Sequence, residues 1–168
     1  MRRALATQPG LAGHLVEPAP ALVAAPLAGT GLSTDHAAGL DLILEGFLLH
    51  HGTARHLNLP DAGRRVLAGD YCYAHGLVWV AEADDLRVIE LLADLVAMSV
   101  ALVSTGDRAG LTPLWRTTIA AIADRDPVFD ERLRLAKDTL RTSCDCAGLH
   151  ALAVGLPDAA RLQEALDA

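Results

Sequence analysis

Residues 86–105 constrain the fold most, because their apolar positions cover more of a helix than one buried face requires. At about 100° per residue these positions fall into two neighbouring stripes. The first stripe contains Leu86, Ile89, Ala93, Val96, Val100 and Val103. The second contains Val88, Leu91, Leu92, Leu95, Met98, Ser99 and Leu102. Together they span roughly 220°, whereas a surface helix of a globular domain needs about 100°. Such a helix is either central to its own bundle or faces a partner chain.

The rest of the chain predicts an all-α fold. Of its 168 residues 52% are hydrophobic but only 4% are aromatic, and Ala and Leu dominate. These residues have high helix propensity, and no segment shows the alternation of a strand. The length suits one domain with a sizeable core. We therefore expect a single-domain bundle of six or seven helices over residues 33–168. Residues 1–32, rich in Pro, Ala and Gly, are expected to form a loose N-terminal arm or short helical pieces.

Capping residues set the expected helix boundaries. Ser33 and Thr34 open the first long helix, Asn58 and Pro60 the second, and Asp84 or Asp85 the third. Thr-Pro at 112–113 and Asp-Pro at 126–127 open two more, and the Gly-Leu-Pro of 155–157 separates the last short helix. The predicted helices span roughly 33–55, 58–83, 86–105, 112–124, 126–154 and 158–167.

Charge and cysteine content narrow the class of protein. The net charge of −7 argues against a nucleic acid or an anionic membrane as partner. Cys72, Cys144 and Cys146 match neither a disulfide framework nor a zinc spacing. The N-terminus has no continuous apolar segment typical of a signal peptide, and Arg87, Glu90 and Asp94 interrupt the longest apolar stretch, which argues against an integral membrane segment. These features predict a cytoplasmic protein.

No cluster of residues predicts a catalytic or metal site. His50 and His51 point about 100° apart on a helix, and His56 lies beyond its expected end. His75 joins them only through tertiary structure. There is no Gly-rich phosphate loop and no nucleophile elbow. Asp70 sits among apolar residues of the second helix, so we expect it to be buried and paired, with a structural hydrogen bond to another helix end.

Two segments resemble the trans-polyprenyl diphosphate synthase family. The run VLAGDY at residues 66–71 resembles the family's "LAGDYLL" helix, and Leu49-His50 resembles the lead-in to its first Asp-rich motif. The segment from Leu140 to Gly155 resembles a "Lys-Thr-Ala…Leu-Gly-Ala…Ala-Gly" helix, with Arg141 where that family has a diphosphate-contacting Lys. The resemblance covers roughly residues 37–160, about three quarters of the chain.

The chain departs from that family where the family binds metal. The resemblance places three Mg²⁺-binding carboxylates just after His50, but residues 51–55 read His, Gly, Thr, Ala and Arg. His51, Gly52 and Arg55 thus form a degenerate first Asp motif. The loop that follows is short, and the second Asp-rich motif is absent. Arg141 remains a candidate diphosphate contact. The resemblance therefore implies no catalytic and no metal-binding residue in this chain.

Small subunits of heterodimeric bacterial prenyl diphosphate synthases share these departures. The resemblance implies a non-catalytic small subunit, needed for the activity and product length of a catalytic large subunit that alone holds Mg²⁺. The family's dimer interface is built mainly from the helices equivalent to 61–82 and 86–105, which agrees with their excess of apolar residues. The candidate residues for the interface or for a neighbouring product tunnel are Tyr71, Tyr73, Trp79, Leu95, Met98 and Val100. Without a partner, the chain is expected to form a homodimer.

Two alternatives stay open. One is a self-associating helical protein that binds an apolar or isoprenoid ligand without catalysis. The other is a metal-independent isoprenoid enzyme whose arginines bind diphosphate, with Arg55, Arg64, Arg65 and Arg141 as candidates. The product length and the identity of the partner are not encoded in recognisable motifs.

Overall fold

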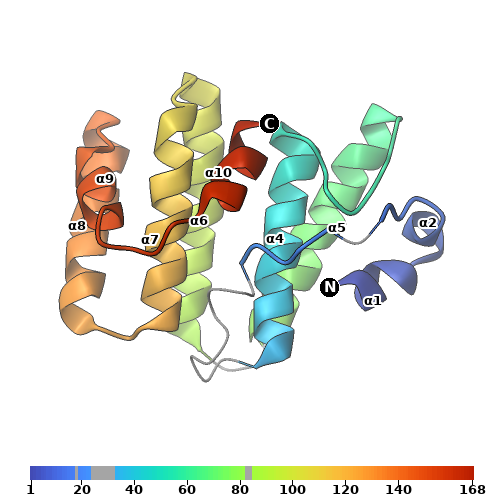
Figure 1. The fold of residues 1–168 in the computed structure, drawn as a ribbon, viewed down its shortest axis with the longest axis horizontal. Coiled ribbons are helices and arrows are strands. Elements are labelled where there is room, and N and C mark those ends of the chain that lie inside the picture. The colour runs from blue at the N-terminus through green and yellow to red at the C-terminus, as the bar shows by residue number, and fades with distance from the viewer. Residues whose placement is uncertain (18, 24–32, 82–84) are drawn as a thin grey trace. The chain divides into compact units, whose positions relative to one another are not determined.

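The structure, a computed structural model, describes residues 1–17, 19–23, 33–81 and 85–168. The described residues form α-helices and one 3-10 turn, and their one β feature is an isolated antiparallel bridge between Leu15 and Leu57. The all-α prediction is confirmed (Figure 1). The contacts divide the chain into two compact units, Met1–Leu86 with Ala168, and Arg87–Asp167.

The first unit is built on two long antiparallel helices, α4 (Thr34–His51) and α5 (Ala62–Ala81). The side chain of Ser33 caps α4 by accepting a hydrogen bond from the backbone N–H of His36, as the sequence predicts. The helix ends at His51 rather than near residue 55, because Gly52 terminates it. Helix α5 starts later than expected, since Asp61, and not Asn58, accepts from the N–H of Arg64 at 2.8 Å.

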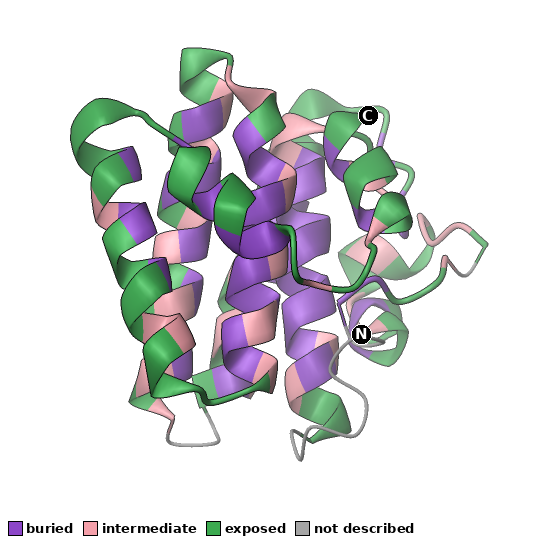
Figure 2. Cartoon of the chain, turned by 60° about the vertical axis from the view of Figure 1, so that its left-hand side comes forward, coloured by how far each residue is buried: buried purple, intermediate pink, exposed green. Residues whose placement is uncertain are grey.

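Two glycine pairs let α4 and α5 approach closely. A Cβ on Gly76 would lie 2.6 Å from the carbonyl oxygen of Gly39, and a Cβ on Gly46 would lie 3.0 Å from that of Gly69. Gly39 and Gly46 stand seven residues apart on α4, and Gly69 and Gly76 stand seven residues apart on α5. Helix α4 is buried without a break from Gly39 to Leu49, which appears as continuous purple in Figure 2.

The N-terminal arm packs on this helix pair. Its short helices α1 (Arg2–Ala6) and α2 (Pro9–Ala12) agree with the predicted helical pieces (Figure 1). Its described part is not loose, however, because Leu5 and Val23 are fully buried and the N–H of Val16 donates to the carbonyl of His56. Leu5 belongs to a core cluster with Leu42, Leu49, Leu57, Leu59, Ala68 and Cys72.

The second unit surrounds α7 (Leu111–Ala123), which contacts a 3-10 turn (Arg108–Gly110), α8 (Pro127–Ser143), α9 (Ala147–Ala153) and α10 (Ala160–Asp167). Helix α6 (Leu86–Thr105) has the predicted boundaries and stops at Gly106, whose φ is +80°. Asp84, one of its two predicted caps, lies outside the described residues.

The prediction of one helix from 126 to about 154 is wrong. Asp126 caps α8 as expected, by accepting from the N–H of Val128. The helix then ends at Ser143, because the next residue, Cys144, adopts a left-handed conformation with φ of 55°. Helix α9 starts at Ala147. With this break, the described part of residues 33–168 contains seven α-helices, α4 to α10, in agreement with the predicted six or seven, and the arm adds α1 and α2.

Candidate functional site

The resemblance places a metal site at the end of α4. In the structure the histidine side chains there contact residues of α4 and α5. The Nε2 of His50 lies 3.2 Å from the Oδ1 of Asp70 on α5, and its ring stacks on Tyr73 with centroids 5.4 Å apart. His51 packs its ring against Phe47 at 5.2 Å and against His50 at 5.8 Å. The expected pairing of Asp70 with another helix end is therefore correct. Its expected burial is wrong, since 65% of its side chain is exposed.

The loop after α4 is held by a buried carboxylate. Glu45, 1% exposed, accepts hydrogen bonds from the backbone N–H groups of Arg55 at 3.1 Å, His56 at 2.8 Å and Leu57 at 3.2 Å. Burial raises the pKa of Glu45, and these three donors oppose that rise. The guanidinium of Arg55 donates to the carbonyl of Pro20 at 2.6 Å. Arg55 thus joins the loop to the arm in this structure.

One turn earlier on α4, Asp41 holds the arm in the same way. Its Oδ1 accepts from the N–H groups of Leu22 and Val23, both at 3.0 Å. Sequence reasoning overlooked Asp41 and Glu45, although two acidic residues four positions apart inside an apolar helix are a visible signal. Buried carboxylates need donors, and here backbone amides supply them. The carboxylate of Asp41 holds the arm and that of Glu45 holds the loop after α4. These hydrogen bonds account for the burial of both side chains.

His56 is buried at 4% exposure, and neither ring nitrogen has a hydrogen-bond partner among the described residues. Burial, together with the charges of Arg55, Arg2 and the N-terminal ammonium, lowers its pKa to about 4. His75 instead contacts Tyr71 and Trp79 with its ring. Within the described ranges, no three His, Cys, Asp or Glu side chains come together in a way that could hold a metal ion.

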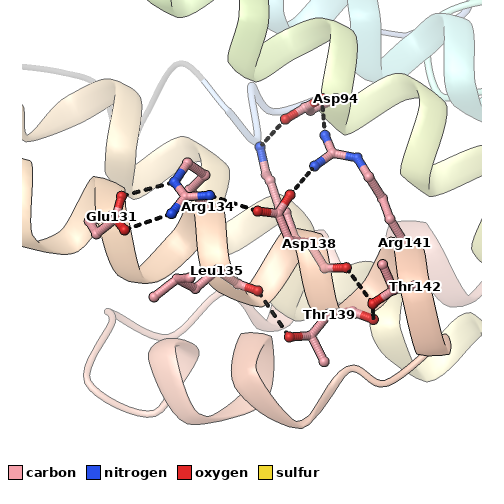
Figure 3. A network of polar contacts seen from close by, with 9 residues as sticks. Asp94, Glu131, Arg134, Leu135, Asp138, Thr139, Arg141 and Thr142 are labelled. Carbon is pink, nitrogen blue, oxygen red and sulfur yellow. Dashed lines mark hydrogen bonds and ion pairs between the residues drawn. The ribbon is translucent and has the colours of Figure 1, made fainter.

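Arg141, the candidate diphosphate contact, is bound within the second unit. Its guanidinium pairs with Asp94 on α6 and, at 2.8 Å, with Asp138 on α8 (Figure 3). The same Asp94 lies 3.5 Å from the Nζ of Lys137, the single lysine of the chain, which is 1% exposed. Burial lowers the pKa of Lys137, and Asp94 opposes that shift. The network joins α6 to α8 and gives Arg141 a structural role.

The candidate interface residues differ in how far they are exposed. Leu95 and Met98 are buried at 1% and 4%, so they are not free surface. The other four are partly covered: Tyr71, Tyr73, Trp79 and Val100. On α6 the second stripe is mostly buried and the first mostly is not, so the two predicted stripes occupy different environments.

An apolar face of α5 stays exposed. Val66, Ala74, Leu77, Val78 and Ala81 lie on one side of this helix at helical spacing. Val66 is 49% exposed and Val78 is 50% exposed, while Leu77 is partly covered. Asp70, paired with His50, is the one charged residue on that side of the described helix.

The three cysteines are free thiols. Burial raises the pKa of Cys72 to about 12, and burial together with Asp107 raises that of Cys146 to about 11. Both therefore stay protonated at neutral pH, which argues against a nucleophilic role for either.

None of the helices that the structure describes combines the length and the apolar composition that a membrane crossing requires. Comparisons of the chain with protein-family models, with curated proteins and with solved structures find no match in any of the three.

Proposed function

We propose that this chain is the non-catalytic small subunit of a heterodimeric polyprenyl diphosphate synthase. In this proposal the catalytic large subunit holds Mg²⁺ and the diphosphate substrates, and the small subunit is needed for its activity and product length.

The exposed apolar face of α5 carries the proposal. Contiguous apolar area on a monomer marks a contact surface when it exceeds a few hundred Å². Val66 and Val78 stand three helical turns apart, and the residues of the face between them are small or apolar except for Asp70. The face is therefore long enough to receive a helix of another chain. The resemblance assigns the dimer interface to this same helix.

The end of α4 supports the non-catalytic part of the proposal. Mg²⁺ requires oxygen ligands in a near-octahedral shell, and residues 51–55 provide no carboxylate. His50 and His51 contact Asp70, Tyr73 and Phe47. The nearest carboxylates on α4, those of Asp41 and Glu45, accept bonds from backbone amides.

Half-buried aromatic residues on α5 suggest how such a subunit affects product length. A growing prenyl chain is stabilised by about 0.8 kcal/mol for each buried CH₂, so it extends until side chains block it. Tyr71, Tyr73 and Trp79 are bulky and only partly covered within this chain. In the heterodimer they would form part of the wall beside the growing product.

Reconstitution tests the proposal. The chain is purified alone and added in increasing amounts to a catalytic prenyl synthase subunit from the same source, with Mg²⁺, isopentenyl diphosphate and an allylic diphosphate. We expect no turnover by the chain alone, and turnover that rises to a plateau at one chain per catalytic subunit. Metal-dependent turnover by the purified chain, or an unchanged rate and product distribution in the mixture, would contradict the proposal.

A further inference from the structure

The first unit contains a pocket between the N-terminal arm and the start of α5, and Tyr71 is the residue of its lining that the proposed function also uses. It has a volume of about 550 Å³, within the range of small-molecule sites. One wall is α2 with the segment that follows it, and the other is the first half of α5 with Leu59. Figure 1 shows α2, in dark blue, on the same side of the first unit as α5.

The walls of the pocket are mostly apolar. Leu11, Leu59, Leu67 and Tyr71 line it, and Leu67 is 70% exposed. Leu59 is buried in the core cluster, and Leu11 and Tyr71 pack against that cluster. An apolar wall with a firm base and an open rim favours a ligand with a hydrocarbon part, because burying that part releases water from both surfaces.

A cationic group lies at the same pocket. The guanidinium of Arg64 has its Nη1 3.3 Å from the Nε2 of His14, and both residues line the cavity. A guanidinium only donates hydrogen bonds, so Arg64 can act only as the donor in this contact. An imidazole ring carries no negative charge and so does not compensate the guanidinium, which leaves Arg64 with capacity for an oxyanion.

The surrounding charges favour an anion further. Although the chain carries a net charge of −7, no Asp or Glu is among the described residues that line this cavity. Asp61, the nearest acidic residue in the sequence, directs its Oδ1 to the backbone N–H of Arg64 at 2.8 Å. Burial raises the pKa of Tyr71, so its phenol keeps its proton and adds no negative charge.

We propose that this pocket binds an amphipathic anion, with an oxyanion head on Arg64 and His14 and a hydrocarbon tail against Leu11, Leu59, Leu67 and Tyr71. The shared chemistry is a carboxylate or phosphate head on an apolar chain. This site does not depend on the subunit role, because every residue in it belongs to the first unit of a single chain.

Titration calorimetry on the purified full chain tests the proposal, with octanoate, octyl phosphate, butanoate and 1-octanol as probes below their aggregation concentrations. Each additional buried methylene is expected to raise affinity about fourfold. Octanoate should therefore bind at least tenfold more tightly than butanoate, and at least tenfold more tightly than the uncharged octanol. Tighter binding of octyl phosphate identifies a phosphate head, and tighter binding of octanoate a carboxylate head.

Neighbouring arginines provide a matched control. Arg64→Gln should weaken octanoate binding at least tenfold, whereas Arg65→Gln, the same change at an exposed residue outside the pocket lining, should leave it within twofold. Leu67→Asp is a second variant, at an exposed position of the apolar wall, and should abolish octanoate binding. Equal affinity for octanoate and octanol, equal effects of the two arginine variants, or no binding at millimolar concentration would overturn the proposal.

Discussion

Gly76 shows how a single missing side chain sets the spacing of two helices. A Cβ at this position would lie 2.6 Å from the carbonyl oxygen of Gly39 and 2.7 Å from the Cγ1 of Ile43. Both distances are below van der Waals contact, and a backbone carbonyl inside a helix cannot move away easily. Gly76 is therefore required for packing, even though glycine lowers helix propensity.

We expect Gly76→Ala to destabilise the chain by about 2 kcal/mol, the magnitude of an overpacked core. Gly63→Ala, on the same helix, is the matched control, because its Cβ would approach only the flexible side chain of Asp61 at 3.3 Å. That variant should be neutral or stabilising by up to about 1 kcal/mol. Urea denaturation measures both changes, and a Gly76 variant as stable as the Gly63 variant would refute the close helix contact.

His56 makes stability depend on pH. Its folded-state pKa of about 4 lies below the ordinary value of 6.5, so unfolding takes up a proton between these two pH values. Its contribution is present above pH 6.5 and is lost as the pH falls towards 4. His56→Leu removes both this proton uptake and two buried ring nitrogens without partners among the described residues.

The free energy of unfolding of the wild type should therefore fall by about 2 kcal/mol more than that of His56→Leu between pH 7 and pH 4, after allowance for nearby charges that solvent screens. The exposed His150→Leu serves as control and should keep the wild-type dependence. Parallel curves for wild type and His56→Leu in denaturation series across this range would show that the ring is not buried as a neutral group.

At the scale of helices, α6 and α8 are joined through Asp94. Removing its charge takes from the buried Lys137 the carboxylate that acts on it most strongly, and breaking a buried pair costs several kcal/mol. Asp94 is 35% exposed, so we expect a smaller loss, about 2 kcal/mol, for Asp94→Asn. Arg141→Gln breaks only more exposed pairs and should cost less than about 1 kcal/mol.

The double variant Asp94→Asn with Lys137→Met separates charge from packing. Methionine fills a similar volume without a charge, so most of the lost stability should return. Thermal or chemical unfolding of the wild type, of Asp94→Asn, of Lys137→Met and of the double variant measures the coupling between the two side chains. A double variant less stable than Asp94→Asn alone would mean that Lys137 acts through other contacts.

The sequence predicted α6 and the capped starts of α4 and α8 because their signals are local. Ser33, Gly106 and Asp126 act on backbone groups within a few residues. The break at Cys144 was missed because a left-handed cysteine has no local signature. The glycine contacts between α4 and α5, and the roles of Asp41 and Glu45, depend on residues distant in sequence.

The same limit applies to the candidate site. The resemblance predicts that His51, Gly52 and Arg55 stand in place of carboxylates, but it does not predict which residues they contact. Asp70 was expected to be buried because its helical neighbours are apolar. It is exposed because that apolar face of α5 is itself exposed. An apolar helix face predicts a contact, and periodicity alone does not say whether the contact is made within the chain.

For the whole molecule, we propose that the α5 face is a subunit contact. With no partner present, the same face should pair two copies of this chain, since exposed apolar helix faces associate. Val78 is half exposed, so Val78→Asp should change folding stability by less than about 1 kcal/mol while placing a charge in the contact. Val128→Asp is the matched control, because Val128 is also exposed, at 66%, but lies on α8.

Sedimentation equilibrium of the purified chain at micromolar concentration is the most direct test, with far-ultraviolet circular dichroism confirming that each variant is folded. We expect a dimer for the wild type and for Val128→Asp, and a folded monomer for Val78→Asp. A folded wild-type monomer, or a Val78→Asp protein that dimerises as tightly as wild type, would contradict the assignment of α5 as the contact surface.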